Sequence, residues 1–98
     1  MSSTCYYRTS PSHGWLKVSL TDFPDAENYG TGFGYHDIPK RHVYLEEDVE
    51  MPAFLMDHPE VVVVEQYMNS DAGMRALPHI EKRLDYDAYI ERRYGKKI

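Results

Sequence analysis

The chain is poor in cysteine, in long apolar runs and, over most of its length, in positive charge. Cys5 is the only cysteine among 98 residues, which excludes an internal disulfide, and the absence of a nearby histidine or lysine predicts an inert thiol. No apolar run is longer than the four valines at 61–64, too few to span a membrane. The N-terminal residues lack the apolar stretch of a signal peptide. We therefore expect a cytoplasmic protein without a membrane partner.

Positive charge is scarce before residue 75. Residues 1–74 carry 12 Asp and Glu against four Lys and Arg, a balance of −8, whereas residues 75–98 carry seven Lys and Arg against four acids, a balance of +3. The two balances give the net charge of −5. An acidic body disfavours direct binding to nucleic acid and favours a partner with a basic surface.

Alternating and helical patterns predict the secondary structure. Leu16, Val18 and Leu20 alternate with other residues as in a half-buried strand, and the valines at 61–64, apolar on both faces, indicate a central strand. Asp85 is positioned to cap a helix that begins at Tyr86. The elements expected are strands at 15–20, 35–38, 41–46 and 61–68, and helices at 48–58 and within 79–94.

These elements predict an α+β fold. We expect a small sheet of three to four mainly antiparallel strands packed by one or two helices, in the order strand-strand-strand-helix-strand-helix. A length of 98 residues fits one domain over 1–98. We expect a flexible N-terminus at 1–10 and a flexible tail at 95–98.

Acidic residues crowd the start of the first predicted helix. Glu46, Glu47, Asp48 and Glu50 place four carboxylates within five positions. In the simplest interpretation, they lie where the positive end of the helix dipole stabilises anions. Such a cluster can also contact a basic groove or chelate a divalent cation. Because the spacing is not that of a calcium loop, we predict no metal and assign the four residues to partner binding.

A glycine-rich aromatic segment precedes the predicted hairpin. Glycines at 30, 32 and 34 flank Thr31 and Phe33, but no Lys-Ser or Lys-Thr follows, so the pattern is not a phosphate-binding loop. One interpretation is a flexible loop that exposes Tyr29, Phe33 and Tyr35, and the other is a glycine-bent strand whose aromatics fill the core. We assign the three aromatic residues to partner binding.

Candidate catalytic groups are few. No nucleophile motif is present, and we predict no catalytic residue and no cofactor. The five histidines do not follow a metal motif, but His36, Asp37 and His42 would meet across the predicted hairpin as two histidines and one carboxylate. That trio defines an alternative function, a small metal-dependent or hydrolytic enzyme.

Two segments resemble a family of small proteins. SHGWLKV at 12–18 and VYLEEDVEMPAFL at 43–55 are similar to segments of small uncharacterised proteins carried by bacterial plasmids and phages. The similarity is weaker at 28–36 and from residue 69 onward. The resemblance implies a setting, an accessory gene on a mobile element, and it assigns no catalytic residue.

Small acidic proteins in that setting often act as stoichiometric inhibitors of host defence, including anti-CRISPR proteins. Our leading hypothesis is a non-enzymatic protein in the cytoplasm of a bacterial host that binds a host protein or nucleoprotein complex and occludes its basic nucleic-acid-binding surface. A third hypothesis is a structural, homo-oligomeric module in which the valines at 61–64, or another strand edge, pair with a second copy.

Overall fold

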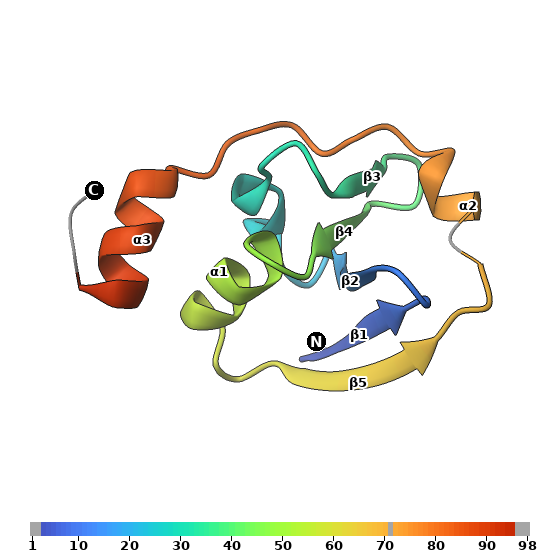
Figure 1. Ribbon diagram of the computed structural model, residues 1–98, viewed down its shortest axis with the longest axis horizontal. Helices are drawn as coiled ribbons and strands as arrows, with labels where there is room; N and C mark the ends of the chain where they lie inside the picture. Colours follow the sequence, from blue (N-terminus) through green and yellow to red (C-terminus); the bar gives the residue numbers. More distant parts are fainter. Residues whose placement is uncertain (1–2, 71, 96–98) are drawn as a thin grey trace.

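A mixed sheet organises the chain. The computed structural model describes residues 3–70 and 72–95, and within them five strands lie in the order β3-β4-β2-β1-β5 (Figure 1). Neighbouring strands are antiparallel except β1 and β5, which run parallel. The strands are β1 (Thr4–Thr9), β2 (Gly14–Ser19), β3 (Tyr35–Asp37), β4 (His42–Glu46) and β5 (Val62–Tyr67).

Three α-helices and one 3₁₀ helix complete the described part of the chain. They are η1 (Ala26–Tyr29), α1 (Glu50–Asp57), α2 (Ala72–Arg75) and α3 (Tyr86–Tyr94). The α+β class is therefore confirmed. The sheet is larger than expected, because no local pattern predicted β1, and it is mixed because β5 joins β1 in parallel.

The main core lies on the face of the sheet that α1 covers, which we call the helix face. Leu16 and Val18 of β2 and Leu45 of β4 are fully buried there against Phe54 of α1. The alternation that predicted β2 and β4 is confirmed, since these positions all point to one side. Phe23, from the turn after β2, packs edge-to-face on Phe54 with ring centroids 5.4 Å apart.

The expectation of a flexible segment at 1–10 is wrong for residues 4–9. They form β1, which lies between β2 and β5 and buries Cys5. Burial raises the pKa of the Cys5 thiol to about 11, in accord with an inert thiol. The strand escaped prediction because Cys5 is its only fully buried side chain, so no apolar alternation marks it. Residues 1–2 lie outside the described part.

β5 is an edge strand, not the central strand that its valines predicted. All six of its residues are exposed, with Val62 at 55%, Val63 and Val64 at 40% each and Tyr67 at 67%. Figure 1 shows β5 at the margin of the sheet beyond β1. A valine run needs full cover on both faces to be central, and the described chain leaves every residue of β5 exposed.

The C-terminal segment crosses the molecule before it forms a helix. Residue 79 bridges to Tyr35 beside β3, and the chain then reaches α3, which packs on α1 away from the sheet (Figure 1). The Asp85 side chain accepts a hydrogen bond from the amide of Ala88 at 3.1 Å, which confirms it as the cap. Gly95 ends α3 with φ +68°, a left-handed conformation that favours glycine. The rest of the predicted tail, residues 96–98, lies outside the described part.

The basic C-terminal segment folds back onto the acidic body. The Arg92 guanidinium pairs with Asp57 of α1, and Arg83 pairs with Glu27 of η1 at 3.3 Å. The charge separation along the sequence is thus partly neutralised within the fold. In the part of the chain that the structure describes, no helix has the length and apolarity needed to cross a bilayer.

Candidate binding cleft

Glu50 is a structural residue, not a surface charge. Its side chain is 0% exposed. The carboxylate accepts hydrogen bonds from the amide and hydroxyl of Thr31 at 2.6 and 2.8 Å, from the amide of Glu46 at 2.9 Å and from that of Gly34 at 3.3 Å. A Cβ atom at Gly34 would collide with this carboxylate. Glu50 therefore ties the glycine-rich segment to the start of α1, and it is not available to a partner.

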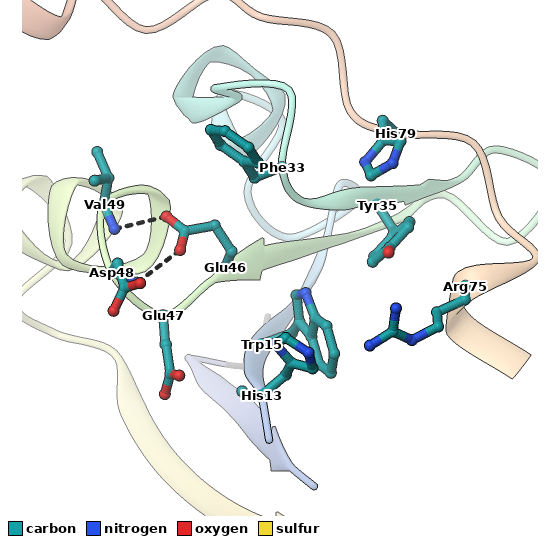
Figure 2. A pocket seen from close by; sticks show the side chains of 11 residues that line it. His13, Trp15, Phe33, Tyr35, Glu46, Glu47, Asp48, Val49, Arg75 and His79 are labelled. Carbon is teal, nitrogen blue, oxygen red and sulfur yellow. Dashed lines mark hydrogen bonds between the residues drawn. The ribbon is translucent and has the colours of Figure 1, made fainter. Parts of the chain in front are cut away.

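Glu46 caps the same helix. Its carboxylate accepts hydrogen bonds from the amides of Val49 at 2.6 Å, Glu50 at 2.9 Å and Asp48 at 2.8 Å, two of which Figure 2 marks with dashed lines. The first amides of a helix lack partners within the helix, and Val49 at the N-cap position has no side-chain acceptor to offer. Two of the four acidic residues, Glu46 and Glu50, therefore stabilise the turn that leads into α1.

Glu47 and Asp48 point outward from that turn. The Tyr7 hydroxyl of β1 donates a hydrogen bond to Glu47, and burial together with this carboxylate raises the pKa of Tyr7 to about 12. Within residues 3–70 and 72–95, the exposed Asp48 side chain makes no hydrogen bond. One oriented and one free carboxylate therefore remain for binding.

Aromatic side chains lie beside these two acids, on the face of the sheet opposite α1, which we call the second face. Trp15 of β2 and Tyr35 of β3 are buried with ring centroids 6.0 Å apart. His79 stacks on Tyr35 at 4.7 Å, and His13 packs on Trp15 at 5.4 Å. The covering segment, residues 72–80, holds this cluster down through Met74.

The acids and the aromatics border one cleft of about 440 Å³. In Figure 2 the acidic turn lies on one side of the aromatic side chains and Arg75 of α2 on the other. Phe33, 72% exposed, stands at the rim. The lining residues are His13, Gly14, Trp15, Phe33, Tyr35, Glu46, Glu47, Asp48, Val49, Arg75 and His79.

The cleft unites five of the seven residues that the sequence assigned to partner binding. They are Phe33, Tyr35, Glu46, Glu47 and Asp48. Tyr29 lies elsewhere: its ring packs edge-on to Phe54 at 5.6 Å, and its hydroxyl donates to Asp57 of α1. Burial and this hydrogen bond raise the pKa of Tyr29 above its ordinary value. Tyr29 thus braces η1 against α1.

Sequence reasoning missed the floor and the far side of the cleft. Trp15 lies on the side of β2 opposite Leu16 and Val18, and nothing local in the sequence indicates that residues 72–80 cover that side. His79 reaches Tyr35 across more than 40 positions of sequence, and Arg75 comes from a four-residue helix that was not predicted. These are long-range contacts with no local signature.

The alternative histidine site is not assembled. Asp37 pairs with His42 across the β3–β4 hairpin, which confirms the hairpin, but His36 pairs with Val43 and so points to the other face. Among residues 3–70 and 72–95, no group of three His, Cys, Asp or Glu side chains is arranged to hold a metal ion.

Comparison of the chain with protein-family models, with curated proteins and with solved structures finds no match.

Proposed function

We propose that the protein is a non-enzymatic binding protein whose cleft receives a basic side chain of a partner protein. The observation that carries this proposal is the position of Glu47 and Asp48 beside an aromatic floor with Phe33 exposed at its rim. An arginine or lysine can stack on aromatic faces while its charged end pairs with carboxylates. The cleft offers both kinds of contact within one concavity.

The charge distribution supports a basic partner. Residues 1–74 have a balance of −8, which attracts cations over a distance set by the salt concentration. Several acids are engaged inside the fold, among them Asp57 with Arg92 and Glu27 with Arg83. Glu47 and Asp48, by contrast, border the cleft.

The partner that fits the sequence-based expectations is a basic, nucleic-acid-binding surface of a complex in the bacterial cytoplasm. A protein bound to this surface would exclude nucleic acid from it, as anti-CRISPR-like proteins of mobile elements do. It would act through its negative charge and would not need to resemble nucleic acid in detail. The acidic charge and the resemblance of the segments at 12–18 and 43–55 to plasmid and phage proteins support this partner.

The single tryptophan makes the cleft directly testable. Trp15 lines the cleft and is the only tryptophan in the chain, so its fluorescence reports on occupancy. We expect a capped tetra-arginine peptide to change this fluorescence saturably, with an affinity that falls as salt rises, because the contact is in part an ion pair at a solvated rim.

Matched variants separate the cleft from general acidity. The double variant Glu47→Gln/Asp48→Asn should lose most of the response, whereas Glu65→Gln/Glu91→Gln removes the same charge from exposed positions outside the cleft and should keep it. Equal responses from the two variants would refute the cleft as the binding site. Capture from bacterial lysate at low and moderate salt, with both variants alongside, then tests whether the partner is a nucleoprotein complex.

The exposed edge of β5 favours a second candidate function, self-association. An antiparallel pair of β5 strands centred on Val64 would place Glu65 opposite Val63 of the second copy, so that no like charges face each other. Val64→Lys should abolish any concentration-dependent rise in solution mass. Ile38→Lys, at a residue that is also exposed but lies in the β3–β4 turn, is the control, and a mass independent of concentration in the parent chain would exclude this function.

A further inference from the structure

The free edge of β5 lacks most of the features that keep an edge strand from pairing. Proline, lysine, bulges and inward-pointing charges usually protect such edges. β5 contains neither proline nor lysine, and its register with β1 runs from Val62 to Tyr67 without a bulge. Glu65 is the one charged residue of the strand. The edge is therefore open to another strand along its length.

The backbone groups of alternate residues face this edge. The amide of Val62 donates a hydrogen bond to the carbonyl of Ser3 at 2.9 Å, and the amide of Met68 donates to the carbonyl of Thr9 at 2.6 Å. Even-numbered residues of β5 thus face β1, and the N–H and C=O groups of successive residues in a strand point to opposite sides. The residues that face the free edge are Val63, Glu65 and Tyr67.

This alternation limits how a second copy can pair with β5. Two copies that share the same edge are related by a two-fold axis, so their β5 strands run antiparallel. Hydrogen-bonded pairs form only between residues that face the edge, so an odd-numbered residue must lie opposite an odd-numbered residue. Of the long registers, one pairs residues 62–66 around Val64 and the other pairs residues 63–67 around Glu65.

Charge and apolar contact favour the register centred on Val64. The other register sets Glu65 opposite Glu65 of the second copy, and like charges directly opposite are destabilising. In the Val64 register, Glu65 lies opposite Val63, and the two glutamates are only diagonal neighbours. Tyr6 lies beside Val64 on the second face, and these side chains are 39% and 40% exposed. Pairing joins the Tyr6–Val64 contacts of both copies into one apolar row.

We propose that two copies of the chain join through β5 in this register, with Val64 on the two-fold axis, so that two five-stranded sheets become one continuous sheet. This geometry rests on the self-association proposed above for β5, and it makes that association specific. The strands that border the cleft are β2, β3 and β4. Because β1 separates them from β5, both clefts stay accessible in the dimer.

Disulfide formation tests the register. Paired residues that are not hydrogen-bonded to each other have Cα atoms about 4.5 Å apart, within the range of about 4.4–6.8 Å that a disulfide spans. Val64→Cys should therefore form a linked dimer in a glutathione redox buffer. Val62→Cys, on the same face but opposite Gln66, is the matched control and should cross-link at least about tenfold more slowly. Non-reducing gels measure both rates.

The native thiol does not interfere with this experiment. Cys5 is the only cysteine of the chain and is buried, so the parent chain should form no linked dimer. Cys5 also lies beside Val63 in the β1–β5 register. Because side chains alternate along a strand, Cys5 and residue 64 point to opposite faces and cannot bridge within one copy.

Lysine at neighbouring positions gives a second, opposite pair of results. Val63→Lys sets a lysine opposite Glu65 on both sides of the axis, and we expect the dimer to tighten about two- to tenfold at low salt. Val64→Lys sets two lysines opposite each other and should abolish the dimer. Sedimentation equilibrium measures both variants, and all substituted positions are exposed in the single copy, so each variant should fold.

The outcomes separate the register from the self-association. A parent chain whose mass does not rise with concentration refutes both. A concentration-dependent dimer in which Val62→Cys cross-links as fast as Val64→Cys refutes the register alone. The same holds for a dimer that Val63→Lys dissociates as fully as Val64→Lys does.

Discussion

β4 and β5 belong to one sheet, yet they have opposite surroundings. β4 alternates polar and apolar residues and buries Val43, Tyr44 and Leu45, while β5 opens with valines and buries none of its six residues. The more continuously apolar strand is thus the more exposed one. Composition sets what a strand can bury, but its place in the sheet and the elements available to cover it decide what is buried.

The elements that cover the sheet pack on its β3–β4–β2 end. α1 packs on its helix face through Phe54, and Met74 of the covering segment packs on its second face. α3 packs on α1 through Tyr89 and Ile90, where the Arg92–Asp57 pair also joins the two helices. The proposed binding cleft lies on the second face, at the margin of the covering segment, where the cover is incomplete.

Removing one carboxylate from the covered end of the molecule and one from β5 should give the largest difference in the free energy of unfolding. Glu50→Ala leaves the amides of Thr31, Gly34 and Glu46 without their acceptor, and we expect the free energy of unfolding to fall by about 3–5 kcal/mol, from a cost of about 1–3 kcal/mol for each buried unsatisfied group. Denaturant unfolding followed by circular dichroism measures the change.

Glu65→Ala on β5 is the matched control. The same truncation at an exposed position should change the free energy of unfolding by no more than about 0.5 kcal/mol. Glu50→Gln, which keeps one oxygen acceptor, should lie between the two. A loss from Glu65→Ala as large as that from Glu50→Ala would contradict the division into a covered and a bare end.

Truncating an aliphatic residue on each strand tests the same division through packing. Leu45→Ala should lower the free energy of unfolding by about 2–4 kcal/mol, because it removes buried methyl groups and leaves a cavity beside Phe54. Val63→Ala should cost less than about 1 kcal/mol, since 40% of this side chain is already exposed. Comparable losses would mean that β5 is covered in solution, as self-association through its edge would produce.

The sequence predicted the elements whose signals are local. Alternation identified β2 and β4, and Asp85 identified the start of α3, because each signal lies within a few residues of the structure it describes. The position of β5 depends on strand order, which is decided between residues far apart along the chain. β1 lacked a signal because its neighbours in the sheet, not its own pattern, hold it in place.

The acidic cluster shows the same limit at the candidate site. Glu47 and Glu50 are three positions apart and chemically alike, yet one borders the cleft and the other is fully buried. The difference arises because Thr31 and Gly34 bring their amides to Glu50 from a loop 16 to 19 residues away. The sequence located the charged turn, but only the fold distinguishes the carboxylates that build it from those that face the cleft.

The smallest expected effect is a pair of opposite pH dependences of the free energy of unfolding, from one histidine on each side of the sheet. His58 stacks on Phe54 at 4.5 Å on the helix face; burial lowers its pKa, but hydrogen bonds to Asp25 at 2.8 Å and Glu60 at 3.2 Å outweigh burial, and the net shift is upward. His42 on the second face has its pKa lowered by burial and by Lys17.

Linkage gives the two signs. His58 binds its proton more tightly when folded, so its stabilisation is fully present below the unfolded pKa of 6.5 and is lost as pH rises through the folded value. His42 binds its proton less tightly when folded, so stability falls as pH drops from 6.5 through the lowered folded value. In the parent chain, protonation of His58 between about pH 8 and 5.5 should raise the free energy of unfolding by about 0.2–1 kcal/mol, the usual worth of partly exposed ion pairs. Denaturant unfolding of His58→Gln should show that this increase is absent. His42→Gln should instead relieve a loss of stability on acidification, because the folded chain disfavours the protonated imidazole. The same sign of pH dependence in both variants would contradict the opposite shifts of the two histidines.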